Sequence, residues 1–414
     1  MSGDIERALR TAWWPAAAAV ARLAGDLSLA EDCAQEACAA AVEQWPREGW
    51  PANPGGWVVT VARRRALDHL RRESTRPGKE REAVQEQVAA EQDGSAVAGD
   101  DQLALLFACC HPALDPAARV TLTLRVVCGL PVAAIARVLL LPEPAIAQRI
   151  VRAKRKIRDA GIRLRVPGPG DRPARLASVL RAVYLTFTEG HSPQGTGAVV
   201  RDDLSEEALR LARSLHRLLP GEPEVTGLLA LILLTSARSA ARADQDGALV
   251  LLADQDRSRW DQGRLDEGRI LIETALAQRR PGPYQLQAAI AACHADAARS
   301  SDTDWRQIAA LYGELLRFDP SPVIEANRAV AVAYAEGPAA GLAILDTLAA
   351  SSRLARWQQL HIARAAMLAR CGRREDAVAA YRDALALEPA DAVRQHITSQ
   401  ITALAAAPAL TEET

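Results

Sequence analysis

Residues 129–158 read GLPVAAIARVLLLPEPAIAQRIVRAKRKIR, and the pattern predicts two helices joined by a tight turn. Pro131 suits the first turn of a helix, and we expect Ile135 and Val138 on the buried face of that helix. Pro142-Glu143-Pro144 interrupts the pattern, because proline lacks a backbone donor and clashes with a continuing helix. A second helix then runs to about Asp159.

Helical spacing divides this second helix into two faces. The apolar face consists of Ile146, Ile150, Ala153 and Ile157. The polar and cationic face consists of Gln148, Arg149, Arg152, Arg155 and Lys156. Arginine and glutamine can pair with guanine and adenine edges, so this helix suits a DNA major groove. A solvated basic surface helix is the alternative, and the turn lacks the glycine common in helix-turn-helix units.

The composition favours an all-α protein. Of the 414 residues, 49% are hydrophobic but only 4% are aromatic, and alanine and leucine dominate the apolar set. Strand-like alternation of β-branched residues is nearly absent, and the length suggests roughly two to three domains. With a net charge of −1, any contact with nucleic acid must come from local basic patches.

The cysteines predict reduced thiols in the cytoplasm, because there are seven of them and none form a CxxC pair. Cys109-Cys110-His111 is a poor metal site, since adjacent residues rarely converge on one ion; we expect no metal and no cofactor. The N-terminus has no apolar signal region, and the longest apolar run, residues 228–234, is too short to cross a bilayer. We therefore expect no membrane association.

Residues 29–45, LAEDCAQEACAAAVEQW, predict an amphipathic helix after a short turn. Its inward side is expected to contain Ala34, Cys38, Ala41, Val42 and Trp45. Its outward stripe consists of Asp32, Gln35 and Glu36. Such a stripe is either a solvated face or a docking surface for a basic partner helix.

A turn-rich segment, EGWPANPGGW at residues 48–57, precedes another cationic helix. Asn53 followed by Pro54 is typical of a helix start, with an N-cap acceptor and a proline at the first position. The core side is expected to contain Val58, Val61, Ala62, Ala66 and Leu70. The outer side carries Arg63, Arg64, Arg65, Asp68, Arg71 and Arg72. Trp50 and Trp57 could stack on bases or pack in the core.

Three stretches in this order carry a family resemblance: residues 25–45, residues 53–72 and residues 129–158. They resemble the polymerase-clamp-binding helix, the minus-ten helix and the minus-thirty-five helix-turn-helix of extracytoplasmic-function (ECF) sigma factors. The resemblance implies a non-enzymatic initiation factor that binds core RNA polymerase, at its β′ clamp and β flap, and promoter DNA. It implies region 2 at 1–76, a flexible linker at 77–101, region 4 at 102–166, a helical domain at 167–406 and a tail at 407–414.

The resemblance also assigns roles to individual residues. Those expected to bind the clamp are Asp32, Gln35 and Glu36. Those expected to hold the melted minus-ten strand are Asn53, Trp57, Arg64, Arg65, Asp68, Arg71 and Arg72. Those expected at the minus-thirty-five element are Gln148, Arg149, Arg152, Arg155 and Lys156.

The C-terminal half is helical in pattern and contains a repeat. Residues 323–348 align with residues 359–389 when Gly337 is placed on Gly372. The order of small residues predicts tetratricopeptide-like hairpins, whose concave face usually binds protein. The chain thus resembles the ECF subgroup whose C-terminal extension is thought to govern activity.

The sequence leaves two other functions open. A DNA-binding helical-repeat adaptor could act without polymerase. A hydrolase could use Glu189, His191, Asp202 and Asp203, although polar groups at helix ends are more often caps. In this region we expect a helix capped by Asp203 and Glu206.

Overall fold

The computed structural model describes residues 2–74, 98–139, 141–162, 164–191, 201–245, 248–350, 354–389 and 391–406. The regular structure of these residues is helical, apart from one isolated bridge between Ala243 and Leu249, so the all-α prediction is confirmed. The chain forms two compact units, an N-terminal unit of residues 1–186 and a C-terminal unit of residues 187–414.

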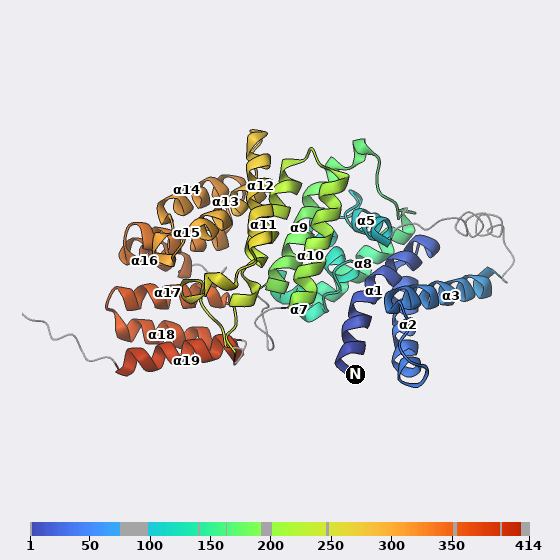
Figure 1. Ribbon diagram of the computed structural model, residues 1–414, viewed down its shortest axis with the longest axis horizontal. Helices are drawn as coiled ribbons and strands as arrows, with labels where there is room; N and C mark the ends of the chain where they lie inside the picture. Colours follow the sequence, from blue (N-terminus) through green and yellow to red (C-terminus); the bar gives the residue numbers. More distant parts are fainter. Residues whose placement is uncertain are drawn as a thin grey trace, which may run out of the picture. The chain divides into compact units, whose positions relative to one another are not determined.

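The N-terminal unit begins with three helices, α1 (Ser2–Ala24), α2 (Leu27–Glu48) and α3 (Pro54–Ser74), which pack on one another (Figure 1). Asp26 caps α2, because its Oδ1 accepts from the backbone N–H of Ser28 at 2.6 Å and of Leu29 at 3.2 Å. Asn53 caps α3 in the same way, accepting from Gly56 N at 2.9 Å, as predicted. Fully buried alanines at their contacts let the three backbones approach closely.

The predicted inward side of α2 is wrong at one residue. Ala34, Ala41 and Trp45 are buried, but the Val42 side chain is 53% exposed. Each helical residue is rotated by about 100° from the one before, and α1 and α3 cover only the side that carries Ala41. Val42, one position on, therefore faces solvent.

Four helices follow in the N-terminal unit, and a fifth crosses into the C-terminal unit. They are α5 (Ala98–Cys109), α6 (Pro116–Val126), α7 (Val132–Leu139), α8 (Glu143–Asp159) and α9 (Pro173–His191), with a 3-10 turn η1 (Pro169–Asp171) before α9. Residues 75–97, most of the predicted linker, and the predicted tail lie outside the described residues. Asp115 caps α6, since its Oδ1 accepts from Ala118 N at 2.9 Å.

Helices α6, α7 and α8 form the predicted helix-turn-helix packing. The apolar stripe of α8 is buried throughout, at Ile146, Ile150, Ala153 and Ile157, as the spacing predicted. The face of α7 is shifted from the prediction: Ala134, Ile135 and Ala136 are buried, whereas Val138 is only half-buried. Val138 lies three residues, or about 300°, from Ile135 around the helix, so it sits on the flank of the buried face rather than at its centre.

Gly129 makes the turn between α6 and α7. Its φ of +73° is a left-handed conformation, and a Cβ built there would lie 2.3 Å from the Trp14 ring of α1. Leu130 N donates to Leu124 O at 3.0 Å, which closes the end of α6. The turn therefore needs glycine for both its backbone angle and its contact with α1.

The C-terminal unit continues as ten helices along the described residues. They are α10 (Asp202–Leu218), α11 (Pro223–Ser236), α12 (Gln262–Ala277), α13 (Pro283–Asp296), α14 (Trp305–Phe318), α15 (Pro322–Ala335), α16 (Pro338–Ala349), α17 (Gln358–Arg370), α18 (Arg374–Leu385) and α19 (Asp391–Ala406). From α10 to α19 each helix packs against the next along the chain (Figure 1).

Helix α11 is the core of this unit's first part. In the described chain, the stretch Pro223–Ala241 has the length and apolarity of a membrane span, but 72% of that window is buried inside the protein. Helices α10, α12 and α13 cover it. Burial in a helical core therefore accounts for its composition.

The two copies of the predicted repeat are helical hairpins, α15–α16 and α17–α18. Both turn at a glycine with positive φ, +113° at Gly337 and +76° at Gly372. The repeat is thus confirmed as a pair of helical hairpins, while its tetratricopeptide character stays a prediction.

The predicted cap of α10 is wrong. The residue at the N-cap position is Arg201, and its side chain caps nothing. Asp203 pairs with Arg201 at 2.8 Å, and Glu206 reaches Arg264 of α12 at 2.7 Å. Arg201 is only two residues from Asp203, but Arg264 lies 58 residues from Glu206, so the local pattern does not reveal the second pair.

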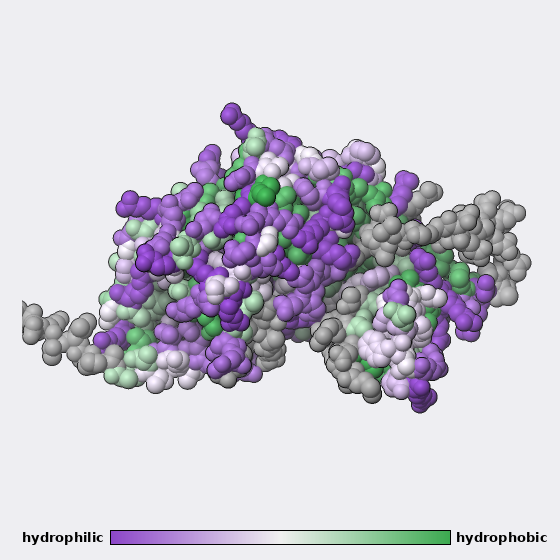
Figure 2. All heavy atoms as spheres, in the orientation of Figure 1, coloured by the Kyte–Doolittle hydropathy of each residue, from purple (hydrophilic) through white to green (hydrophobic). Residues whose placement is uncertain are grey.

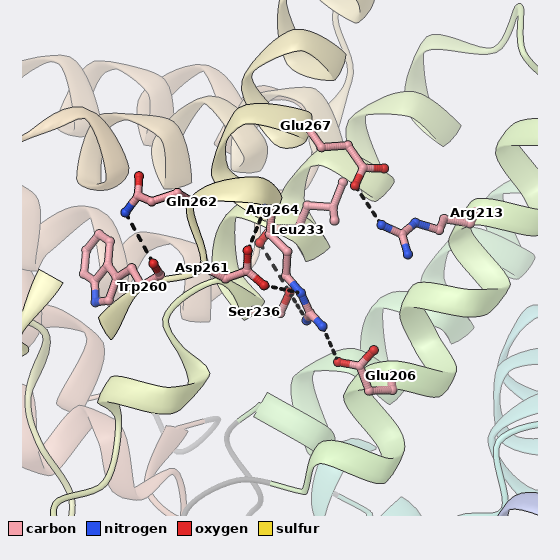
Figure 3. Close-up of polar contacts among 9 residues, drawn as sticks. All are labelled: Glu206, Arg213, Leu233, Ser236, Trp260, Asp261, Gln262, Arg264 and Glu267. Carbon is pink, nitrogen blue, oxygen red and sulfur yellow. Dashed lines mark hydrogen bonds and ion pairs between the residues drawn. The ribbon is translucent and has the colours of Figure 1, made fainter. Parts of the chain in front are cut away.

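Arg264 ties three helices together (Figure 3). Besides Glu206, its guanidinium contacts Ser236 Oγ of α11 at 3.1 Å and Asp261 at 3.3 Å. Arg213 of α10 pairs with Glu267 of α12 at 2.7 Å. Figure 2 shows that hydrophilic residues cover most of the visible face over α10–α12, in keeping with these polar links.

Candidate nucleic-acid interface

The outer face of α8 carries side chains free of described ion pairs. Gln148, Arg152, Arg155 and Lys156 are exposed and Arg149 is half-buried. Arg152, Arg155 and Lys156 line a shallow surface depression together with Asp159. Among the described residues, no carboxylate lies within ion-pair distance of the cations in the depression.

Other cations of the same helix are paired. Lys154 Nζ lies 2.9 Å from Glu31 Oε2 of α2, and both side chains are more than four-fifths buried. Arg158 lies 3.7 Å from Asp26, the residue that caps α2. Helix α8 is thus anchored on α2 by one set of cations while another set faces solvent. Sequence reasoning missed Lys154 and Arg158, because their partners lie more than 100 residues away in the chain.

The cationic side of α3 forms a second shallow hollow. Arg63, Arg64, Asp68 and Arg71 line it, with Thr60 and Leu67. Arg71 lies 3.7 Å from Asp68, one turn earlier on the same helix. Arg64, Arg71 and the neighbouring Arg72 are exposed. Arg65 differs from these, since it turns toward Glu36 of α2 at 3.6 Å.

A tryptophan cluster sits at the start of α3. The Trp45 ring is buried and lies 5.1 Å from the Trp50 ring and 5.6 Å from the Trp57 ring, between centroids. Trp57 is half-buried, whereas Trp50 is 44% exposed. Trp50 is therefore the more exposed of the two outer rings. Asn53 Oδ1 is used by the helix cap, so this oxygen is engaged within the protein.

The acidic face of α2 has two exposed members, Asp32 and Gln35. The third, Glu36, is half-buried and shares its carboxylate with Arg65. Glu31 is separate from this face, since it turns inward to Lys154.

The comparisons agree with this arrangement. The sigma-70 region 2 family matches residues 15–76, and the sigma-70 region 4 family matches residues 104–157. A probable ECF RNA polymerase sigma factor of Mycobacterium tuberculosis, SigI, is 33% identical over 179 residues, which is 41% of this chain and 58% of that relative. The chain belongs to the ECF group of the sigma-70 family.

Similarity extends beyond the sigma regions. An uncharacterized protein of Rhizobium meliloti is 43% identical over 418 residues, covering 100% of this sigma-family chain and 98% of the relative. A family of unknown function, DUF6596, matches residues 175–276. No solved structure matches the chain. The long C-terminal extension is thus shared with a full-length relative.

The structure shows local contacts for the two other groups of residues considered as sites, Cys109-Cys110-His111 and the group around His191. His111 Nδ1 accepts from Ala113 N at 3.1 Å, and burial raises the pKa of the Cys110 thiol to about 12. Among the described residues, no group of three His, Cys, Asp or Glu side chains could hold a metal. His191 Nε2 accepts from Arg242 Nη1 at 2.9 Å, so the nitrogen that a general base would use is occupied.

Proposed function

We propose that this sigma factor binds core RNA polymerase through the outward face of α2 and reads promoter DNA with α3 and α8. The observation that carries the proposal is the division of cations on α8. Lys154 and Arg158 are paired with acids of α2, whereas the cations at the depression have no described carboxylate partner. Cations without internal partners are available for phosphates and base edges.

At the minus-thirty-five element, we propose that Arg152 and Arg155 contact base edges. Gln148 lies one turn before Arg152 on the same exposed side. We assign Arg149 and Lys156 to phosphate contacts. The Lys154–Glu31 pair supports this assignment, because it holds the apolar back of α8 against the protein and its front toward solvent.

At the minus-ten element, we propose that the hollow of α3 holds the melted strand. Its arginines supply phosphate contacts, and the exposed Trp50 ring, in the segment before α3, offers a face on which a base can stack. A base must leave the helical stack before its edge enters a pocket, so melting and binding are coupled. Asp68, half-buried in the hollow, can accept a hydrogen bond from an exocyclic amine.

The docking face is tested by charge reversal. Asp32→Lys combined with Glu36→Lys is expected to abolish pull-down of core polymerase, because a cationic face repels basic clamp helices. Glu43→Lys combined with Glu48→Lys is the matched control, since both residues are exposed on the same helix and the change in charge is equal. If both double variants keep full binding, the docking face is misassigned.

Run-off transcription separates this function from that of a DNA-binding adaptor. A sigma factor added to core enzyme yields a promoter-specific transcript, whereas an adaptor yields none. The Asp32→Lys, Glu36→Lys variant should lose the transcript but retain DNA binding by α8. This result supports the assignment of polymerase binding to α2 and of DNA binding to α8.

We further propose that the C-terminal unit modulates initiation and offers a surface to a protein partner. A chain truncated after His191, which keeps α9 whole, tests this in the same assay. A gain of transcript indicates inhibition by the C-terminal unit, and a loss indicates that it is required. Equal transcript from both chains contradicts a modulatory role.

A further inference from the structure

The C-terminal unit contains two enclosed arginines without a counter-charge. Arg238 and Arg242 flank the 3-10 turn η2 (Ser239–Ala241), which follows α11. Burial lowers the pKa of each guanidinium to about 10, and Arg242 and Arg257 add to the effect on Arg238. In the described chain, no carboxylate forms an ion pair with either group, and both side chains keep some contact with solvent. Buried charges are normally paired, so these two lack an expected partner.

His191, at the end of α9, faces these arginines. Its Nε2 accepts from Arg242 Nη1 at 2.9 Å, which assigns the neutral ring with its proton on Nδ1. Burial and the two arginines keep the pKa of His191 well below its usual value, in agreement with a neutral ring. The residue is only 7% exposed, and Nδ1 finds no hydrogen-bond partner among the described residues. One buried donor is therefore left unused beside the guanidinium groups.

Further unused donors lie in the same region. Arg242 Nε and the hydroxyls of Ser205 and Ser239 are buried without a partner in the described structure. Ser205, which is 3% exposed, lies beside the last turn of α9, because a Cβ on Gly190 would come within 2.6 Å of its Oγ. Arg201 N donates to Gly190 O at 2.7 Å and holds the start of α10 against this turn. Donors from α9, α10 and η2 thus share one neighbourhood.

Neighbouring groups add positive charge. Arg257 Nη1 donates to the carbonyls of His294 at 2.7 Å and Ala297 at 2.8 Å, and its guanidinium lies over the Trp260 ring. The Asp302 carboxylate acts on the pKa of Arg257 in the opposite direction to burial. The carbonyls orient Arg257 but do not cancel its charge. The region is therefore positive and rich in donors; Arg238 and Arg242 are half-buried at its edge, and the unpaired donors are buried behind them.

We propose that Arg238, Arg242, His191 and Ser205 bind the phosphate group of a small phosphorylated molecule. A phosphate has several acceptor oxygens in tetrahedral directions and close to two negative charges at pH 7, which matches two guanidinium groups and neutral donors around them. Its oxygens would accept from His191 Nδ1, Arg242 Nε and the Ser205 hydroxyl. The burial of His191 and Ser205 excludes the phosphate backbone of a nucleic acid and requires a small ligand.

Isothermal titration calorimetry of the full chain tests the site, with inorganic phosphate, glycerol 3-phosphate and acetate as probes at equal ionic strength. We expect saturable binding of at least one of the two phosphate probes and none of acetate. Ser205→Ala and Arg242→Gln should each weaken binding about ten- to a hundredfold. Arg306→Gln, which removes an exposed guanidinium on α14, should leave binding unchanged. Absence of phosphate binding, equal binding of acetate, or unchanged binding by both site variants overturns the proposal.

Arg238→Met separates a binding role from a structural one. No described hydrogen bond or ion pair uses the Arg238 side chain, so its replacement relieves an uncompensated charge while the backbone bonds of the turn remain. We expect a higher melting temperature without phosphate together with at least tenfold weaker phosphate binding. A lower melting temperature with unchanged binding would assign Arg238 a structural role and contradict the proposal. These measurements do not depend on polymerase or promoter, so they stand apart from the sigma function.

Discussion

The turn at Gly129 allows a quantitative test of how the helix-turn-helix is held on α1. Gly129→Ala introduces two costs. A residue with a side chain at φ +73° pays about 1–2 kcal/mol for the left-handed backbone. Its Cβ would also lie 2.3 Å from a Trp14 ring carbon, whereas carbon atoms prefer about 3.5–4.0 Å, so a ring or a helix must move. Such overpacking costs about 1–3 kcal/mol.

Gly161→Ala is the matched control, because φ there is +57° but a new Cβ would meet nothing within 4 Å. We expect it to lower the free energy of unfolding by about 1–2 kcal/mol, the backbone cost alone, against about 2–5 kcal/mol for Gly129→Ala. Trp14→Leu in the Gly129→Ala background should recover at least about 1 kcal/mol, since a smaller side chain relieves the contact.

Urea unfolding of the full chain, combined with hydrogen exchange of peptides from α6 to α8, measures these differences. The exchange data are needed because the two units can unfold in separate transitions. Equal costs for the two glycine variants, or no recovery with Trp14→Leu, would refute the reasoning from the Trp14 contact.

Three further outcomes are expected. Arg152→Ala should reduce discrimination between promoter variants by about 1–3 kcal/mol, whereas Arg158→Ala, which removes a cation paired with α2, should change it little. Burial and the neighbouring Arg238 lower the pKa of His294 from 6.5 to about 4, so the unfolded state takes up a proton first as the pH falls. Moving from pH 7.5 to pH 5 should therefore cost about 2 kcal/mol more in the wild type than in His294→Gln, measured by urea unfolding. Arg264→Met should destabilise the C-terminal unit by about 1 kcal/mol in thermal melts, a value that allows for the partial exposure of its acidic partners. Arg317→Met is the control, since it removes an exposed pair within one helix, and it should cost less than about 0.5 kcal/mol.

Local sequence was sufficient for much of the fold. Asn53 caps the helix predicted for it, because capping depends on a side chain and a backbone N–H only a few residues apart. The buried stripe of α8 follows from helical spacing alone. The cationic faces of α3 and α8 were predictable for the same reason.

Contacts between distant segments account for what the pattern missed. Val42 is exposed because of which helices cover α2, and Glu206 of α10 does not cap its helix because it pairs with Arg264, 58 residues further along the chain.

Residue types and periodicity were thus enough to predict the helices, their caps and the positions of the cations, because these features arise from interactions within a few turns of one chain segment. Only the folded protein separates the paired Lys154 from the unpaired Arg152 and brings His191 to Arg242, since charge pairing depends on atoms that meet through packing of residues far apart in the sequence.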